Sequence, residues 1–429
     1  MQQKIRAATH PIRTSITIPG SKGMTLRALM LAALANGVSE ISGINLCDDT
    51  RALITALYQL GIATQLDENA RSCIVAGGNG QFPKKEATLW CADAEIIACF
   101  LVAACAGTKG TYHLDGSNEL HSHALLPLTT ILSHQNVQTS PTTASMFPLT
   151  INGIDTLEGT NVALIDTNSL IVSALLMIAP YARSSFQFTL TDIVHMQEID
   201  MTCAAMADFN VLAHRNHQNQ IMVPVPQRYQ ARDYTIEPDL SLAAYYFAAA
   251  AVTNGEITIQ PTKLAQSKQS DAIFLTLLEK MGCKTTDTQE GLTVHAPNEL
   301  QGIDISMSDF SDSFLALLAI APFAKSATHI KHSGTPDQTE MDRFNAIKSE
   351  FTKLNIHFES GNHWIKVFPS KPNSGVVNSH NDYRIAMALA VIGLKTSGIT
   401  INQSECVNKV SPNFFFSWNK LSEEVDVSV

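Results

Sequence analysis

The chain has 429 residues, of which 45% are hydrophobic, and a formal net charge of −10. This length suffices for two or three domains with large cores, and the acidic balance without a basic stripe argues against nucleic-acid binding. An anionic small substrate is compatible with this charge only if cations gather locally in a cleft.

Six times along the chain, a short polar loop leads into a long segment of small and apolar residues that predicts a helix. The intervals are about 72 residues long, so each repeat is a supersecondary block in its own right. Repeated helix amino termini are suited to binding anions. The six helices are expected to start near Leu26, Ile97, Leu170, Leu242, Phe314 and Arg384.

A second sequence feature recurs at about the same interval as these helices. Five amphipathic helices are expected to end at residues that tolerate positive φ, namely Gly61, Asn136, Asn210, Gly282 and Asn355. Two short alternating segments follow each of them and predict hairpin strands. Each repeat therefore has the predicted order strand, helix, strand, helix, strand, strand.

Six such repeats predict an α/β (α+β) fold of two similar domains, each with three βαβαββ repeats. The first domain is expected over 20–235 and the second, discontinuous domain over 1–19 and 236–429. The sixth repeat has a helix at 382–396 but no hairpin of its own, so we expect the strand at 12–18 to complete it. Its aromatic run at 414–418 predicts core packing of a terminal helix.

The composition also bears on location and on metals. The eight cysteines are scattered without a Cys-x-x-Cys pair, and the first residues lack an apolar signal region, which favours a reduced, cytoplasmic setting. Apolar helices such as 98–106 are too short to cross a bilayer, so no membrane association is expected. His121 and His123 have no partner cluster, and we expect no metal site and no cofactor.

The first repeat opens with a glycine-rich turn that carries Lys22 and enters a helix that carries Arg27. This is not a Walker loop, because the Gly-x-x-x-x-Gly-Lys spacing is not met. Two interpretations stay open for the local motif: an anion site, or an ordinary strand-to-helix turn with two solvated cations.

Acidic residues recur at the helix entries. Most of these aspartates are expected to be amino-terminal caps, and at most one or two of them need be catalytic. Glu340 and Arg343 begin the fifth amphipathic helix, where a solvated helix start is the alternative interpretation, and Lys409 lies in a loop. The recurring aspartates are Asp93, Asp166, Asp239, Asp312 and Asp382.

Taken together, these motifs resemble the enolpyruvyl transferase family, and within it the branch that acts on shikimate 3-phosphate. The resemblance covers nearly the whole chain in order. It implies two domains of three βαβαββ units, an arrangement like an inside-out α/β barrel, around a ligand cleft between the domains. The matching segments are 19–37, 48–61, 173–180, Glu340–Arg343, 381–387 and 408–409.

The resemblance implies a transferase of aromatic amino acid biosynthesis, on the route to chorismate. The enolpyruvyl group of phosphoenolpyruvate would move to the 5-hydroxyl of shikimate 3-phosphate, with release of phosphate. Asp312 would take the hydroxyl proton, and Glu340 would handle the proton at the methylene, as general acid–base groups. The substrates are the expected partners, and a monomer is expected.

The resemblance also assigns the binding residues. Guanidinium forks suit oxyanions, and domain closure would exclude water. The phosphoenolpyruvate-binding residues would be Lys22, with a catalytic role as well, Arg343, Arg384 and Lys409. The residues for shikimate 3-phosphate would be Arg27, Ser169, His195 and Asp312.

Departures from the family pattern lie mostly in the first domain. Two carboxylates, in the segment Asp93-Ala94-Glu95-Ile96, stand where the family has Asn-Ala-Gly-Thr, and like charge near a bound anion is unfavourable. Further departures are Gly23, Cys99, Asn168-Ser169-Leu170, His195-Met196-Gln197-Glu198 and Thr339. The sequence thus leaves two alternatives: a paralogue with another acceptor or donor, and a non-enzymatic relic.

Overall fold

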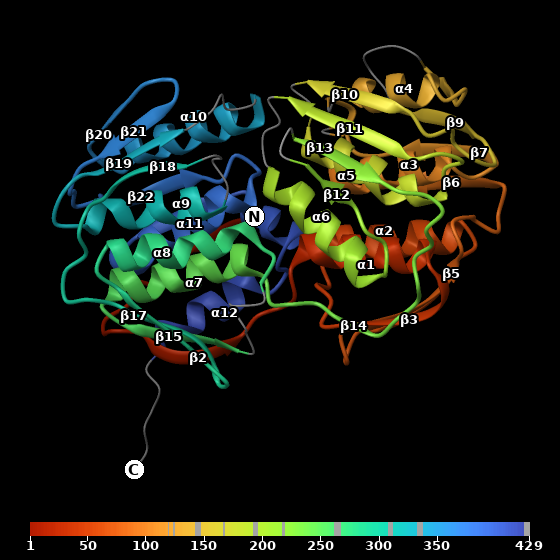
Figure 1. Cartoon of the computed structure of the whole chain (residues 1–429). Helices are drawn as coiled ribbons and strands as arrows, with labels where there is room; N and C mark the ends of the chain where they lie inside the picture. The colour runs from red at the N-terminus through yellow and green to blue at the C-terminus, as the bar shows by residue number, and fades with distance from the viewer. Residues whose placement is uncertain are drawn as a thin grey trace. The chain divides into compact units, whose positions relative to one another are not determined.

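The chain divides into two compact units in a computed structural model (Figure 1). The first unit is Gly20–Glu237, and the second unit combines Met1–Pro19 with Pro238–Val429. The chain thus enters the second unit slightly later than the expected 235/236 boundary. Residues 1–118, 120–122, 125–141, 147–165, 168–191, 196–216, 219–260, 267–307, 312–332 and 338–423 are described, with only the backbone of residues 122, 165 and 312.

The first unit contains three repeats of helices and strands. Its helices are α1 (Lys22–Leu34), α2 (Asp48–Gln59), α3 (Glu95–Ala106), α4 (Leu126–Ser133), α5 (Ser169–Ile178) and α6 (Met196–Asp208). Its strands are β3 (Asn36–Ser42), β4 (Ala63–Asp67), β5 (Ser72–Gly78), β6 (Glu86–Trp90), β7 (Gly110–Asp115), β8 (Gln138–Ser140), β9 (Leu149–Gly153), β10 (Asn161–Ile165), β11 (Phe186–Thr191), β12 (His214–Arg215), β13 (Gln220–Val223) and β14 (Tyr234–Thr235).

Each repeat of the first unit forms a four-stranded sheet. The strand orders are β14-β3-β5-β4, β6-β7-β9-β8 and β10-β11-β13-β12. In each sheet the first two strands are parallel and the hairpin strands are antiparallel to their neighbours. This is the pairing that a strand–helix–strand crossover followed by a hairpin produces.

The second unit repeats this arrangement. Its helices are α7 (Leu240–Thr253), α8 (Ile273–Lys280), α9 (Asp312–Ile320), α10 (Gln338–Lys353), α11 (Tyr383–Lys395) and α12 (Phe414–Lys420), with the short 3-10 helices η4 (Ser270–Ala272) and η6 (Ser404–Lys409). Its strands are β1 (Gln2–Lys4), β2 (Arg13–Thr17), β15 (Glu256–Gln260), β16 (Lys284–Thr288), β17 (Gly291–His295), β18 (Asp304–Met307), β19 (Thr328–His332), β20 (Phe358–Ser360), β21 (Trp364–Val367), β22 (Gly375–Asn378) and β23 (Ile399–Asn402).

The prediction for the strand at 12–18 was wrong. Strand β2 does not complete the sixth repeat but pairs in parallel with β15 of the fourth repeat. The reason lies in β14, which precedes α7 in sequence but pairs with β3 in the first unit and so leaves the parallel edge of β15 open. The sixth repeat is completed by β1, which runs antiparallel to β23.

Three long helices form the centre of each unit. Helices α1, α3 and α5 in the first unit, and α7, α9 and α11 in the second, are buried along almost their whole length. Small and apolar residues occupy every side of these helices, and a helix that is apolar all round is stable only when it is enclosed. The hairpins and the amphipathic helices cover them.

The predicted ends of the amphipathic helices are confirmed by the backbone angles. Gly61, Asn136, Asn210, Gly282 and Asn355 have φ values of 87°, 63°, 67°, 99° and 56°. Each residue terminates its helix in the left-handed region, which glycine and asparagine enter at the lowest cost.

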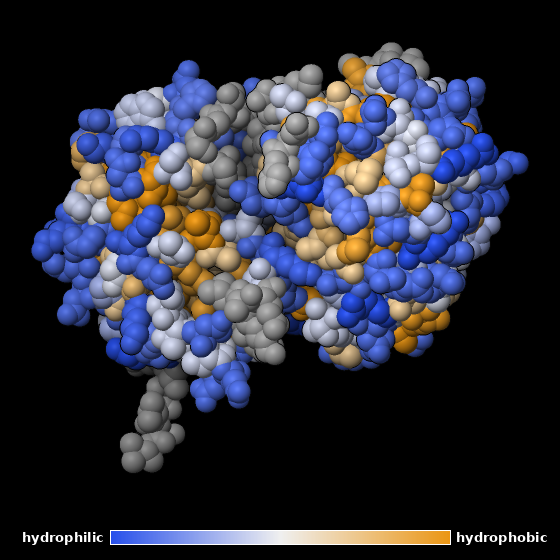
Figure 2. Space-filling model, viewed as in Figure 1, coloured by the Kyte–Doolittle hydropathy of each residue, from blue (hydrophilic) through white to orange (hydrophobic). Residues whose placement is uncertain are grey.

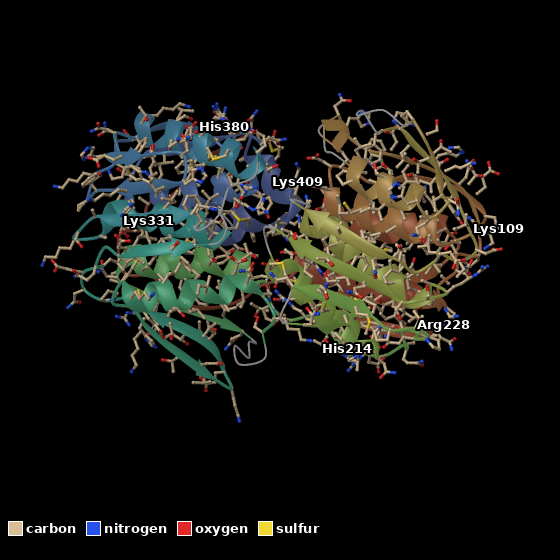
Figure 3. The ribbon with its side chains drawn as sticks, turned by 45° about the horizontal axis from the view of Figure 1, so that its top comes forward. Lys109, His214, Arg228, Lys331, His380 and Lys409 are labelled. Carbon is tan, nitrogen blue, oxygen red and sulfur yellow. The ribbon has the colours of Figure 1, made fainter. Side chains whose placement is uncertain are left out.

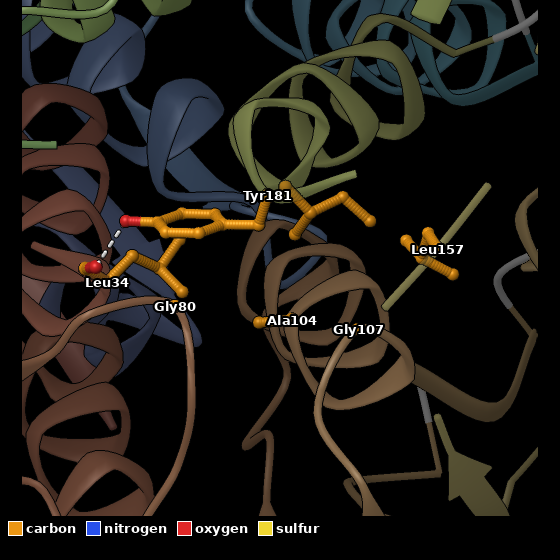
Figure 4. Close-up of a pocket in the computed structure, with 7 residues that line it drawn as sticks. Leu34, Gly80, Ala104, Gly107, Leu157 and Tyr181 are labelled. Carbon is orange, nitrogen blue, oxygen red and sulfur yellow. Dashed lines mark hydrogen bonds between the residues drawn. The ribbon is translucent and has the colours of Figure 1, made fainter. Parts of the chain in front are cut away.

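The carboxyl-terminal ends of α1, α3 and α5 meet at a small pocket within the first unit (Figure 4). The Tyr181 hydroxyl donates a hydrogen bond to the carbonyl oxygen of Leu34, the last residue of α1. This bond satisfies a carbonyl that the helix end leaves without an intrahelical donor. Because the pocket lies at the carboxyl-terminal ends of the helices, it is remote from their amino-terminal entries.

The visible face is mostly polar, with smaller apolar areas on each unit (Figure 2). Phe414 and Trp418 are buried as predicted, whereas Phe416 of the same run is 68% exposed, so that part of the prediction was wrong. In α12 the side chains of neighbouring residues leave the helix in different directions, and only one face can reach the core. No described helix is long and apolar enough to cross a membrane.

Candidate active site

Lys22 is the first residue of α1. The preceding residue, Ser21, caps the helix by accepting a hydrogen bond from the Met24 amide. The Lys22 ammonium lies 2.9 Å from a carboxylate oxygen of Asp49, in the first turn of α2, and the two side chains are 21% and 6% exposed. The local motif is therefore more than a solvated turn, because its lysine is partly buried and ion-paired.

Arg27 lies one turn further along α1 and is completely buried. Its Nε donates to the Thr202 hydroxyl at 2.7 Å, and Nη1 donates to the Gly23 carbonyl at 3.1 Å. Its Nη2 donates to a carboxylate oxygen of Glu198 at 2.6 Å and to the Glu198 carbonyl at 3.2 Å. The guanidinium predicted to bind shikimate 3-phosphate is thus held by α6 in the described conformation.

Ser169, another residue predicted to bind the acceptor, begins α5 and is buried. Asn168 caps this helix by accepting from the Leu170 amide, and its Nδ2 donates to the Glu95 carboxylate at 2.8 Å. Both Glu95 and Glu198, two of the departures from the family pattern, therefore engage polar groups of the first unit itself. His195 lies outside the described residues.

The expected role of the recurring aspartates is confirmed at two positions. Asp239 accepts from the Leu242 amide at 3.0 Å, and Asp382 accepts from the Arg384 amide at 2.8 Å. At the entry of α3 the residue before the helix is Ala94, and the Asp93 carboxylate accepts from the Ser117 hydroxyl. Asp312 begins α9, with its backbone alone described, and Asp166 is outside the described residues.

Arg343 and Arg384 of the second unit both contact Asp382, Arg343 through its guanidinium and Arg384 through its backbone amide. The Nε of Arg343 donates to Asp382 at 2.9 Å, with the two side chains 10% and 21% exposed. The Arg384 guanidinium carbon lies 4.4 Å from the ring centroid of Tyr383. Burial opposes ionisation of Asp382, but the charges of Arg343 and Arg384 hold the pKa of this carboxyl below its ordinary value.

Lys409 belongs to the same neighbourhood. It is the last residue of η6. This short helix packs against α11, whose second residue is Arg384. Burial is the main cause that raises the pKa of the Cys406 thiol to about 11; Asp382 contributes to the rise, and a hydrogen bond with Ser379 and the charge of Lys409 oppose it. Arg343 is thus paired with Asp382 at the entry of α11, Arg384 is the second residue of that helix, and Lys409 ends the short helix packed against it. A local concentration of cations is what an anionic ligand requires in a chain of net negative charge.

Glu340 lies in the first turn of α10 and is 2% exposed. One of its carboxylate oxygens is 3.7 Å from Nε2 of His332, a buried residue at the end of β19. The interpretation of Glu340 as part of a solvated helix start was therefore wrong. Sequence reasoning missed His332, because a single histidine in a strand carries no local signal of a partner.

Asp49 and Glu198 were likewise not predicted as partners of the two cations of α1. The sequence could have indicated Asp49 as the partner of Lys22. Asp49 stands in the first turn of α2, the next helix along the chain, and the amino-terminal ends of neighbouring helices lie close together. Glu198 is separated from Arg27 by 171 residues. Among the described residues there is no group of three or more His, Cys, Asp or Glu side chains arranged for a metal ion.

Residues 7–418 match the family model described as EPSP synthase (3-phosphoshikimate 1-carboxyvinyltransferase). The 3-phosphoshikimate 1-carboxyvinyltransferase of Trichormus variabilis is 37% identical over 420 residues, covering 97% of this chain and 98% of its own. The enzyme of that name from Nostoc punctiforme is 36% identical over 424 residues, covering 98% and 99%.

Solved structures show the same fold. The EPSP synthase from Acinetobacter baumannii has a TM-score of 0.84 at 20% identity and covers 98% of both chains. The enolpyruvyl transferase NikO from Streptomyces tendae has a TM-score of 0.77 at 15% identity, covering 98% of this chain and 97% of its own. At these identities the likeness concerns the fold alone.

Proposed function

Because the chain belongs to the EPSP synthase family, we propose that it transfers the enolpyruvyl group of phosphoenolpyruvate to the 5-hydroxyl of shikimate 3-phosphate and releases phosphate. The structural observation that supports this proposal is the pairing of Arg343 with Asp382 at the entry of α11, the helix whose second residue is Arg384. Phosphoenolpyruvate carries a phosphate and a carboxylate, and both are oxyanions that guanidinium and ammonium groups bind.

The reaction needs three proton transfers and one leaving group. The acceptor oxygen forms a bond to the enol carbon of phosphoenolpyruvate, its hydroxyl proton goes to a base, and the methylene carbon gains a proton. The resulting tetrahedral intermediate then loses a proton from the methyl group and expels phosphate, which restores the double bond. The donor-binding cations would stabilise the departing phosphate, because their charge is already oriented toward it.

Asp312 and Glu340 are proposed for the proton transfers. Asp312 begins α9, and its carboxylate would accept the hydroxyl proton. Glu340 would deliver and remove the proton at the methylene from its buried position in the first turn of α10. The nearby His332 imidazole is a suitable proton partner for Glu340.

The first unit would supply the acceptor side through Arg27, Ser169 and His195. Lys22 of the same unit is proposed to bind the donor and to take part in catalysis. Because the Glu198 carboxylate already accepts a hydrogen bond from Nη2 of Arg27, an acceptor anion that binds to this nitrogen would have to displace it. Glu198 is 35% exposed, so its carboxylate has access to water once it leaves the guanidinium.

A second candidate is transfer to a different acceptor, and the Arg27–Glu198 pair is the observation that favours it. A guanidinium that is neutralised by the chain itself has less charge to offer to an anionic acceptor. Such an enzyme would release phosphate from phosphoenolpyruvate with another alcohol but not with shikimate 3-phosphate. A relic without activity would release none with any alcohol.

The test is phosphate release from phosphoenolpyruvate plus shikimate 3-phosphate, with mass-spectrometric detection of the enolpyruvyl product. Asp312→Asn should abolish release, whereas Asp304→Asn, which alters an exposed carboxylate of the same unit, should leave it unchanged. Release that needs both substrates supports the proposal. Folded wild-type protein that releases no phosphate with shikimate 3-phosphate would reject it, and a panel of other phosphorylated alcohols would then separate the second candidate from a relic.

We further propose that the protein works in the cytoplasm as a monomer and without a metal or organic cofactor. The eight thiols are free, and seven of them are buried, which suits a reducing compartment. Sedimentation of the purified chain should give the mass of one copy. Dialysis against a chelator should leave phosphate release unchanged.

A further inference from the structure

Glu350, in the second half of α10, is a carboxylate with a completely buried side chain. Its oxygens accept hydrogen bonds from Nζ of Lys353 at 2.8 and 3.0 Å and from the Asn378 amide at 3.0 Å. Nε2 of His380 lies 2.6 Å from the same carboxylate. A buried charge is tolerated only when it is paired and hydrogen-bonded in this way, so the contacts of Glu350 are a built feature of the fold.

Two of these partners lie on one short loop. Residues Asn378 to Asp382 connect the end of β22 to α11, and this loop ends on the carboxylate that holds Arg343. Figure 3 labels His380 on the second unit; it is the middle residue of this loop, and its side chain is 37% exposed. Glu350 therefore contacts the loop at its start, while Arg343 contacts it at its end.

The spacing along α10 explains how one helix reaches both points. Arg343 and Glu350 are seven residues apart, which is about two helical turns, so both side chains leave the same face of α10. Arg343 donates to Asp382, and Glu350 accepts from Asn378. The face of α10 thus fixes both ends of the loop.

The loop needs such support because two consecutive residues are in the left-handed region. His380 has a φ of 53° and Asn381 a φ of 59°. Asparagine tolerates this conformation, but for histidine it is unfavourable and persists only when surrounding contacts determine it. Inside the loop, the Ser379 hydroxyl donates to the Gln403 carbonyl and accepts from the Asn381 amide.

We propose that Glu350 is a positioning residue for the donor site: by holding the loop from Asn378 to Asp382, it keeps Asp382 where it orients Arg343 and Arg384 toward the oxyanions of phosphoenolpyruvate. This inference rests on the proposed function, because it assigns the two arginines to the donor. Glu350 acts through Asp382 and the two arginines, and its own carboxylate is enclosed.

The test is Glu350→Gln in the full chain, with Asp271→Asn as a matched control. Asp271 is also a buried carboxylate of the second unit, but it accepts from the Ser313 amide and from the hydroxyls of Ser241 and Ser313, at the entries of α9 and α7. The two variants should lose similar thermal stability. They differ in the segment that loses a hydrogen-bond partner: the loop from Asn378 to Asp382 in Glu350→Gln, and the entries of α9 and α7 in Asp271→Asn.

Glu350→Gln should raise KM for phosphoenolpyruvate about tenfold and leave KM for shikimate 3-phosphate within twofold of the wild-type value. Glu350→Asp keeps the charge on a shorter side chain, and its KM for phosphoenolpyruvate should lie between the values of the wild type and of Glu350→Gln. Asp271→Asn should leave KM for phosphoenolpyruvate unchanged. A Glu350→Gln variant that is less stable but has the wild-type KM for phosphoenolpyruvate would overturn the proposal, since it would show a merely structural role.

Amide hydrogen exchange separates this inference from the proposed function. In the wild type the Asn378 and Asp382 amides are hydrogen-bonded, and Glu350→Gln should accelerate exchange across the loop but not in α9. If the wild-type chain releases no phosphate, the proposed function fails by that measurement. Unchanged exchange in the loop would then overturn the positioning role independently of any activity.

Discussion

The two units present their cations differently. In the first unit, each cation of α1 has a carboxylate of its own, Asp49 for Lys22 and Glu198 for Arg27. In the second unit, the charges of Arg343 and Arg384 act on the single carboxylate of Asp382. The same repeat architecture therefore supports a one-to-one pairing in one unit and a shared counter-ion in the other.

This difference teaches where ligand binding requires rearrangement. On the proposed assignment, Asp382 already orients Arg343 through the hydrogen bond from its Nε. Arg27 has donated most of its N–H groups to Glu198, Thr202 and Gly23, so an anion there competes with groups of the chain. The proposed donor half would therefore be preorganised at Arg343, whereas the proposed acceptor half at Arg27 would depend on exchange of partners.

The largest expected effect comes from Glu340→Gln, which removes the proposed proton carrier of the second unit. The kcat for phosphate release should fall by roughly 10²- to 10⁴-fold, the usual contribution of a general acid–base group. Glu359→Gln, at an exposed position in β20, is the control and should have wild-type kcat. A kcat within threefold of wild type in Glu340→Gln would remove Glu340 from the mechanism.

Arg343→Gln tests the shared counter-ion directly. Loss of a charged hydrogen-bond donor to an anion should raise KM for phosphoenolpyruvate by roughly 10- to 100-fold. KM for shikimate 3-phosphate should stay near the wild-type value, as should both constants in Arg183→Gln, whose exposed arginine pairs with Glu158. Equal changes in both KM values would show that Arg343 supports the whole site rather than the donor.

Glu198→Gln tests the one-to-one pairing in the first unit, with an expected gain of affinity. Removal of the competing negative charge should lower KM for shikimate 3-phosphate by about three- to tenfold, because like-charge repulsion and competition for Arg27 both disappear. Glu158→Gln removes an exposed carboxylate of the same unit and serves as the control. A higher KM for shikimate 3-phosphate would mean that Glu198 contributes to acceptor binding.

The smallest expected effect concerns the pH dependence of stability. The pKa of Asp382 is lower in the folded state than in the unfolded chain, where it is about 3.9, so its stabilising contribution is present above that value. This contribution is lost as the pH falls through the lower, folded pKa. Asp382→Asn should therefore be less stable than wild type at pH 7 and lose less free energy of unfolding between pH 5 and pH 2, measured by urea unfolding. If the free energies of unfolding of the wild type and of Asp382→Asn fell equally with decreasing pH, this prediction would be contradicted.

The sequence predicts much of the fold because its signals are local. The positive φ at Asn136, Asn210 and Asn355 follows from the residue type at each helix end, and the buried helices follow from their apolar composition. The pairing of β2 with β15 and of β1 with β23 was missed, because strand partners depend on which sheet edges remain open after the chain has crossed between units.

The candidate site was predictable in its cations and acids but not in their partners. Lys22, Arg343 and Glu340 stand in motifs that can be recognised from neighbouring residues. Glu198 and His332 become partners only through tertiary packing, and in the sequence they are an acid at a helix start and a histidine at a strand end. Ion pairs between distant segments leave no periodic pattern in the sequence.

The most direct test of this account is phosphate release measured over a grid of both substrate concentrations, for the wild type, Arg384→Gln and Glu198→Gln. We predict that the wild type requires both substrates, that Arg384→Gln raises only KM for phosphoenolpyruvate, and that Glu198→Gln lowers only KM for shikimate 3-phosphate. A wild type without turnover, or two variants that shift the same KM, would contradict the division of the site between a preorganised donor half and a self-paired acceptor half.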